Sequence, residues 1–513
     1  MEIKITFFDG VDCIGGNKFL LESKSSSIFL DFGQNFNEEG KYFDEFLKPR
    51  KILGIKDLLI LGLLPPLRGI YRKDFEIPKI WNNFRNHSLY REVEVQGVLL
   101  SHAHLDHMGY ITYLDPDIPI ITSLGSAIIC KALQDTGSDL EASYIIPREV
   151  EDEILKAKSP KEAPYIQRKF FIIGEEKGCV NNFWKTCHSS RDLEHKELKF
   201  FSEINLEDFK IKAFPVDHSI PYALAFAIET PVGYIVYTGD LRLHGRNSYL
   251  TKKFIEEVTK VKPVVLICEG THPNSNKNTS EEEVFENSLK VVKGSEGLVI
   301  VDFGARNIER LISFLEIAKE TQRKLVLTLK DIYLLWALNE ADDLFPNLFK
   351  EDVITLYQRP KGRYEKWEKA ILEVFSFPEK MVGYKDIQKN PKDFILCFSY
   401  YDFPALLDIN PQGGTYIYSS SEAYNEEMLI DHEKIENWMR LFGIKIFGSL
   451  GKDRESSGFH ASGHLTGKDL EEMIETIKPE YLIPIHTQEK EFFKKFHGLC
   501  KVIFPNKGNT FYL

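Results

Sequence analysis

Short apolar runs separated by turn residues characterise the first part of the chain. The runs in "KITFFDGVDCIGGNKFLLES" and "SSIFLDFGQNF" break at Gly, Asp and Ser, a pattern that predicts short strands joined by turns. Residues 36–93 form a mixed, partly basic stretch without clear periodicity. From Val93 to Gly270, strand patterns alternate with stretches of helical type, such as "SPKEAPYIQRKF" at 159–170.

The pattern changes after the acidic segment "SEEEVFENSLKVV", whose charges we expect on a solvated helix face. Residues 298–338, "LVIVDFGARNIERLISFLEIAKETQRKLVLTLKDIYLLWAL", show the order strand, helix, strand, helix that is typical of a parallel α/β unit. The unit continues to about residue 430. From Leu441 onward a turn, a helix over "GKDLEEMIETIKPE" and a strand over "YLIPIHT" are expected.

Length and composition describe a globular protein of several domains. The chain has 513 residues, of which 43% are apolar and 28% charged, and this length suggests about two to four domains. The net charge of −12 argues against a general affinity for nucleic acids or anionic membranes. This net charge is still compatible with a local basic groove, or with metal ions as the main positive charge of a site.

Neither a targeting segment nor a membrane span is expected. The first residues, "MEIKITFFDG", lack the features of a signal peptide, and the longest apolar run, "LLILGLLPPL", is short and contains two prolines. The seven cysteines are odd in number and not closely paired, which fits a reducing compartment. We therefore expect a cytoplasmic protein without membrane association.

One short loop gathers metal-binding side chains. "SHAHLDHMGY" follows the apolar run "VQGVLL" and contains His102, His104, Asp106 and His107. Only 14 histidines occur in the 513 residues, so a chance cluster of this kind is rare. The loop therefore favours a metal site over an ordinary polar turn.

Four more apolar strands end abruptly at a residue suited to metal binding or acid–base chemistry. Strand ends deliver side chains to one edge of a sheet, where rigid backbone fixes their geometry. A single histidine after a strand is more often structural than a metal ligand. Because the same pattern recurs at several strand ends beside the histidine-rich loop, we favour a role in metal binding or catalysis for these residues. These four residues are His218, Asp240, Glu269 and His486.

Two-metal hydrolysis explains why so many ligands are needed. Such sites hold two ions about 3.5–4 Å apart, each with several protein ligands and an open position for water. His102 and His104 can face one ion, and Asp106 and His107 the other. His218, His486 and Asp240 are then available as the missing third ligands and as the bridge. Imidazole and carboxylate ligands suit zinc, with manganese as an alternative.

These segments resemble the metallo-β-lactamase fold. "HAHLDH" resembles its His-x-His-x-Asp-His signature, and "DHSIPYALAFAI" and "YTGDLRLHGR" resemble its third and fourth metal motifs. "CEGTH", "HASGHLTGKDL" and "IPIHTQ" resemble motifs A, B and C of the β-CASP branch, whose members cut nucleic acids. The similarity is chiefly to ribonuclease J and related prokaryotic RNA-processing nucleases. It runs from about Ile3 to Leu513, with insertions at 36–93 and 145–205.

The resemblance implies a fold and a division of the chain. The fold would be α/β, an αββα metallo-β-lactamase sandwich with an inserted α/β (β-CASP) domain. Residues 1–275 would form the first part of the sandwich and 276–435 the inserted domain. Residues 436–513 would complete the sandwich and carry motifs B and C.

The resemblance also assigns roles to residues. Asp31 would orient the metal loop, and Glu269 with His464 would lie near the scissile phosphate and supply the general acid. The first zinc would be held by His102, His104 and His218, the second by Asp106, His107 and His486, with Asp240 as the bridge. The implied contacts to substrate phosphates are His460, Ser462, Ser419, Ser420 and Ser421.

A zinc-dependent ribonuclease is the expected function, giving 5′-phosphate and 3′-hydroxyl products from single-stranded RNA in RNA processing or decay. The chain ends 27 residues after His486, where typical ribonuclease J has a further domain, and "PIHT" replaces the commoner "PVHG". These departures leave open whether the enzyme is a homodimer, and whether it acts as an exonuclease or an endonuclease.

Three other functions remain as alternatives. The first is a DNA-directed nuclease of the same fold, but the DNA-repair branch usually lacks a histidine at the position of His486. The second is a small-molecule metallo-hydrolase, against which the α/β insertion argues because it could cover a long substrate groove. The third is a binding subunit without metal, which the complete set of ligand positions disfavours.

Overall fold

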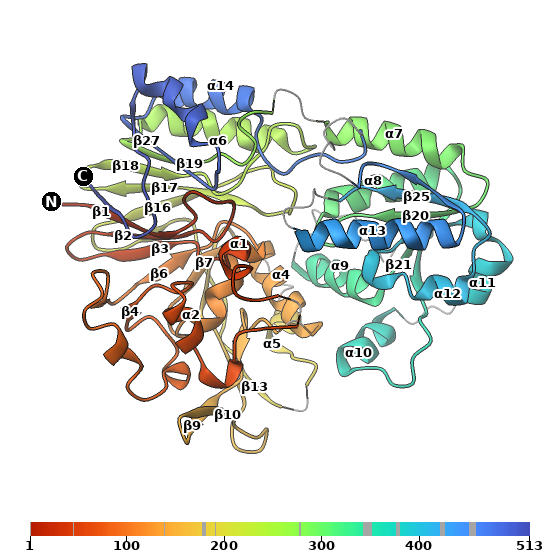
Figure 1. Cartoon of the computed structure of the whole chain (residues 1–513), viewed down its shortest axis with the longest axis horizontal. Coiled ribbons are helices and arrows are strands. Elements are labelled where there is room, and N and C mark those ends of the chain that lie inside the picture. Colours follow the sequence, from red (N-terminus) through yellow and green to blue (C-terminus); the bar gives the residue numbers. More distant parts are fainter. Residues whose placement is uncertain are drawn as a thin grey trace.

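Two sheets packed face to face form one part of the molecule, and a third sheet forms the other (Figure 1). The computed structural model describes residues 2–44, 46–137, 139–176, 181–189, 191–275, 279–341, 351–375, 380–420, 426–450 and 458–513. The first sheet has the strand order β14 (Lys199–Phe201), β12 (Phe170–Ile173), β7 (Ile120–Thr122), β6 (Gly97–Leu99), β3 (Ser27–Leu30), β2 (Lys18–Glu22), β1 (Lys4–Asp9), β29 (Thr510–Tyr512). The second has the order β15 (Ile204–Asn205), β16 (Lys210–Pro215), β17 (Leu224–Thr230), β18 (Gly233–Tyr237), β19 (Val265–Glu269), β27 (Tyr481–Ile485), β28 (Lys501–Val502).

Apolar side chains from both sheets fill the space between them. The rings of Phe19 and Tyr237, one from each sheet, meet edge to face with centroids 6.1 Å apart, and both belong to one buried cluster. Helices α6 (Ser248–Val261) and α14 (Gly467–Ile477) pack on the outer face of the second sheet. Helix α4 (Leu124–Asp135) packs on the outer face of the first sheet. The expected αββα layering is therefore confirmed.

The third sheet is entirely parallel. Helices including α8 (Ile308–Glu320) and α9 (Leu329–Ala341) pack on one face, and α11 (Tyr384–Lys389), α12 (Ala405–Ile409) and α13 (Glu426–Leu441) on the other. Within the described ranges, no helix is long and apolar enough to cross a bilayer. The strand order is β23 (Met381–Val382), β22 (Ile354–Tyr357), β21 (Lys324–Leu327), β24 (Phe394–Cys397), β20 (Leu298–Asp302), β25 (Gly414–Tyr418), β26 (Ile444–Phe447).

One expectation about an individual segment needs correction. The stretch 159–170 is not helical: it contains β11 (Tyr165–Gln167) and reaches the start of β12. Pro160 and Pro164 lack amide donors and disfavour helical backbone at the residues before them.

The last strand of the third sheet, β26, lies beyond residue 435, the expected end of the inserted domain. The domain division stays a prediction, and we propose to move this boundary to about residue 447.

A buried ionic cluster, which we call the junction, joins the inserted domain to the sandwich. Glu281, the first residue of α7 (Glu281–Lys293), accepts hydrogen bonds from Arg242 Nη1 at 3.0 Å and from Arg310 Nε at 2.9 Å. Arg242 also pairs with Asp217 at 3.3 Å and with Glu309. Both arginine side chains are completely buried. The acidic run at the start of α7 is therefore not wholly solvated, because Glu281 points into the protein.

Replacing Glu281 by Gln should destabilise the protein strongly. Arg242 would keep Asp217 and Glu309, but Arg310 would lose its ion-pair partner Glu281. Removing one partner of a buried ion pair costs about 3–5 kcal/mol. Urea unfolding measures this loss. Glu282→Gln changes the exposed neighbour on the same helix and should have little effect. Equal stability of the two variants would show that the junction contributes nothing net.

Candidate metal centre

The carboxyl ends of several strands meet at one edge of the sandwich. Strands β18, β19 and β27 are parallel neighbours, so the residues that follow them lie side by side. This register brings together Asp240, Glu269 and His486. Strands β3 and β6 are also parallel neighbours, and they carry Asp31 and the histidine-rich loop to the same edge.

Three histidines form the first ligand group. The Nε2 atoms of His102 and His218 lie 3.0 Å and 3.2 Å from Nδ1 of His104. Nδ1 of His218 faces the carbonyl oxygen of Gly463 at 2.6 Å, which fixes the ring with Nε2 turned inward. Burial lowers the pKa of His218 to about 3 and places the pKa values of His102 and His104 well below the usual range. The neutral imidazoles that result are the form that binds metals.

A mixed group of carboxylates and histidines lies next to it. His486 Nε2 is 3.2 Å from Asp106 Oδ2, and His107 Nε2 is 3.0 Å from Asp240 Oδ2. The same Asp240 oxygen lies 3.8 Å from Nε2 of both His102 and His486. Asp240 is thus a carboxylate within reach of both groups, which is the position that a bridging ligand requires.

Asp31 holds the metal loop from below. Its Oδ2 accepts hydrogen bonds from Ser101 Oγ at 2.8 Å and from the Tyr237 hydroxyl. The same oxygen lies 2.6 Å from His107 Nδ1. This contact turns Nε2 of His107 toward Asp240. Gly33, two residues after Asp31, is needed for the close approach of the loop, since a Cβ there would lie 1.7 Å from the carbonyl oxygen of Asp106.

Glu269 and His464 form a pair beside Asp240. His464 Nδ1 lies 3.3 Å from Glu269 Oε1 and 3.1 Å from Thr271 Oγ1, while Thr271 also donates to Glu269 Oε2 at 2.9 Å. Burial lowers the pKa of His464, but the carboxylates of Glu269 and Asp240 outweigh this effect and raise it to about 9. A third possible ligand group is formed by four neighbouring side chains, those of Asp240, Glu269, His464 and His486.

The expected substrate contacts lie on loops around this edge. His460 Nδ1 is 3.4 Å from the carbonyl oxygen of Ser419. Ser419 is buried, and its hydroxyl donates to the carbonyl of Phe459 at 2.5 Å, so it faces protein. Ser462 accepts from the amide of His464 at 3.2 Å. Ser420 is partly exposed, and Ser421 lies outside the described residues.

Two residues were missed by sequence reasoning. Arg306, from the turn after β20, donates from Nη1 to the carbonyl of Ala103 at 3.1 Å, and its charge acts on His104 and Asp106. No local pattern could reveal it, because its position depends on how the inserted domain docks. Thr271 connects Glu269 with His486 Nδ1, which lies 2.9 Å from Thr271 Oγ1. The sequence "CEGTH" contains Thr271 two residues after Glu269, which was the only available signal.

The arrangement fits metal ions. Seven side chains offer imidazole nitrogens or carboxylate oxygens in two groups, and in each group these atoms lie within 4.8 Å of one another. The buried Oδ1 of Asp240 has no hydrogen-bond partner within the described residues. Buried polar atoms of this kind need a partner, and a divalent cation between the two groups would provide one.

Comparison with known proteins agrees with this chemistry. Residues 458–495 match the family described as RMMBL, Zn-dependent metallo-hydrolase RNA specificity domain. The chain is 24% identical over 500 residues to ribonuclease J of Mycoplasma genitalium, covering 95% of this chain and 68% of the relative. It is 22% identical over 506 residues to ribonuclease J of Pyrococcus abyssi, covering 94% and 89%. The resemblance to the metallo-β-lactamase and β-CASP ribonucleases is thereby confirmed, and a metal cofactor is supported.

A solved structure shares the fold over the whole length. This protein of unknown function from Enterococcus faecalis is 22% identical, with a TM-score of 0.68 and complete coverage of both chains. The likeness concerns the fold alone.

Replacing Asp31 by Asn should weaken metal binding. Asn tolerates the left-handed backbone at this position, where φ is 55°, but its amide has one acceptor oxygen instead of two. It cannot accept both from the backbone amide of Ser101, which is 2.7 Å from Asp31 Oδ1, and from the groups at Oδ2. Loss of such an orienting partner typically lowers metal affinity about 10–100-fold. Zinc titration against a chelator measures the affinity.

Asp12 provides a matched control for this prediction. Its φ is 59° and its side chain is 51% exposed, so Asp12→Asn should bind zinc as the unmodified chain does. Full zinc affinity in Asp31→Asn would contradict the orienting role.

Proposed function

We propose that the chain is a zinc-dependent ribonuclease that hydrolyses RNA phosphodiester bonds. The observation that carries this proposal is the position of Asp240 Oδ2, within 4.0 Å of nitrogen atoms from both ligand groups. The match of residues 458–495 to an RNA specificity domain, and the ribonuclease J relatives, support RNA as the substrate.

We assign two zinc ions to the centre, with manganese as an alternative. His102, His104 and His218 would hold one ion, and Asp106, His107 and His486 the other, with Asp240 between them. When bound, such ions lower the pKa of a water molecule toward about 7 and compensate charge on the phosphate. The chain's part is to keep His102, His104 and His218 neutral by burial. It also fixes the rings of His107, His486 and His218 through Asp31, Thr271 and Gly463, respectively.

His464 is our candidate for the general acid. Glu269 holds the ring by its Nδ1 atom and favours the protonated form. A proton given to the leaving 3′ oxygen would yield 3′-hydroxyl and 5′-phosphate products. The charge of Arg306, which acts on Asp106 from the inserted domain, favours an anionic substrate at this edge.

Finer points of the proposal concern substrate form, assembly and location. We propose single-stranded RNA, because a flexible strand can pass between two domains. A homodimer is an additional hypothesis that light scattering would test, and cleavage of end-labelled RNA would distinguish exonuclease from endonuclease action. The free cysteines, such as Cys13 and Cys130, favour a reducing cytoplasm.

Hydrolysis assays on zinc-loaded protein test the function directly. We expect cleavage of single-stranded RNA, binding that weakens as salt is added because phosphate contacts release counterions, and little action on blunt duplex DNA. Asp240→Asn should lower the metal content, measured by elemental analysis, and abolish hydrolysis. Equal cleavage of duplex DNA would favour the DNA-directed alternative. An active Asp240→Asn variant would exclude the two-metal centre.

His464 and His486 look alike in sequence but should respond differently to replacement by Ala. His486→Ala should lower the occupancy of the second metal position. His464→Ala should keep both ions while slowing turnover by about 10²–10⁴, the usual contribution of a positioned general acid. That deficit should shrink on a nitrophenyl phosphodiester, whose leaving group needs no proton. Metal loss in His464→Ala, with retention in His486→Ala, would reverse the two assignments.

A further inference from the structure

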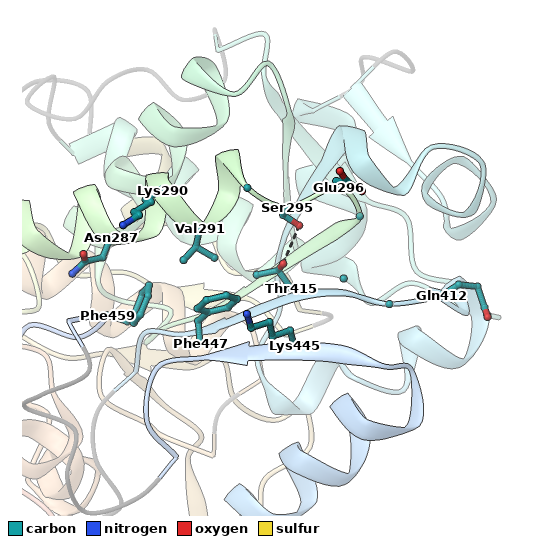
Figure 2. A pocket seen from close by; sticks show the side chains of 14 residues that line it. Asn287, Lys290, Val291, Ser295, Glu296, Gln412, Thr415, Lys445, Phe447 and Phe459 are labelled. Atoms are coloured by element: carbon teal, nitrogen blue, oxygen red, sulfur yellow. Dashed lines mark hydrogen bonds between the residues drawn. The ribbon is translucent and has the colours of Figure 1, made fainter.

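An open groove lies on the inserted domain, between helix α7 and the edge strand β26 (Figure 2). Its volume is about 870 Å³, within the range of about 300–1,000 Å³ that small-ligand sites occupy. Helix α7 contributes Asn287, Lys290 and Val291, and β26 contributes Lys445 and Phe447. The turns that precede β20 and β25 and the ring of Phe459 complete the lining. We call this feature the α7–β26 groove.

One end of the groove adjoins the loops around the metal centre. Phe459 directly precedes His460, and its carbonyl accepts hydrogen bonds from Ser419 Oγ at 2.5 Å and from Arg310 at 3.3 Å. Asn287 of α7 donates to the carbonyl of the preceding Gly458 at 2.9 Å. The described lining of the groove thus reaches Phe459, the residue next to His460, which is an expected substrate contact.

Two aromatic rings are placed for stacking. The ring centroids of Phe447 and Phe459 are 6.0 Å apart, and both side chains are only partly buried. Figure 2 shows the two rings side by side beneath α7, with Lys445 next to Phe447. Exposed aromatic faces bind the bases of single strands with little regard to sequence, because every base has a π face.

Positive charge accompanies the rings. Lys290 and Lys445 are exposed, and neither forms an ion pair with a described residue. Lys293, on the same helix, pairs with Glu320 at 3.1 Å. Glu296, the one acidic residue among the described lining residues, lies at the end away from Phe459 (Figure 2). In a chain of net charge −12, two such lysines beside aromatic rings favour a phosphate-bearing ligand.

The planes of the Phe447 and Phe459 rings are inclined by 60°, so each ring offers a separate face. We propose that the α7–β26 groove binds single-stranded RNA away from the scissile phosphate, with one base stacked on Phe447, another on Phe459, and phosphates near Lys290 and Lys445. The inference rests on the proposed ribonuclease function and adds a second contact for the same substrate. A contact that does not touch the reacting phosphate strengthens substrate and transition-state binding equally, so it changes KM and leaves kcat unchanged.

Steady-state kinetics of the zinc-loaded protein test the groove. The RNA should have about 20 nucleotides, more than the roughly 4–16 that a single-strand site covers. Phe447→Ala should raise KM for this RNA by about tenfold, from the loss of one stacked base, with kcat unchanged. Phe447→Tyr keeps the ring and should keep KM. Replacing both Lys290 and Lys445 by Ala should raise KM and flatten its salt dependence.

Controls separate the groove from the metal centre. Every variant should hydrolyse a nitrophenyl phosphodiester at the unmodified rate, which also shows that it is folded, and Lys293→Ala should leave KM for RNA unchanged. If the unmodified chain cuts RNA but Phe447→Ala has the same KM, the groove inference is wrong and the proposed function stands.

Two other results would also overturn the inference. An unmodified chain that hydrolyses the nitrophenyl diester but neither binds nor cuts RNA would exclude the proposed function and the groove together. A change in oligomeric state by light scattering in Phe447→Ala, with unchanged KM for RNA, would show that edge strand β26 contacts a second protein chain instead.

Discussion

The structure depends on one buried carboxylate, that of Glu281. It accepts from Arg242 of the sandwich and from Arg310 of the inserted domain. Arg242 also donates to the carbonyl of Ser462 at 3.2 Å, and Arg310 to the carbonyl of Ser419 at 2.9 Å. The loops on both sides of the metal centre are thus held by two cations that share one anion. In a low-dielectric interior such charges are stable only when paired and hydrogen-bonded, so the two domains have a strongly preferred relative position.

The candidate metal centre was predictable because each proposed ligand carries a local signal. His218, Asp240 and His486 each follow an apolar strand within a few residues, and parallel pairing turns these separate signals into one site. The parallel α/β unit was predictable for a similar reason, since strand and helix periods alternate clearly from residue 298 onward. Motif similarity added the pairing of ligands with ions, which spacing alone left open.

Features that depend on long-range docking were not predictable. Glu281 belongs to an acidic run that looks solvated, yet its burial is decided by two arginines at positions 242 and 310. Arg306 has no recognisable neighbours in sequence, and it reaches the metal loop only because the third sheet packs against the sandwich. The error at 159–170 has a simpler origin, since prolines outweighed the apparent helical period.

The order of the ligands along the chain has a consequence for biosynthesis. The first ligand group needs residues up to His218, but the second needs His486, which follows β27, the strand that pairs with β19. A polypeptide still attached to the ribosome before that point has neither His464 nor His486, and β27 is missing from its sheet. A nascent chain that ends before His486 therefore lacks a proposed ligand of the second ion, so the proposed hydrolysis of RNA, including the messenger being translated, requires that synthesis has passed β27.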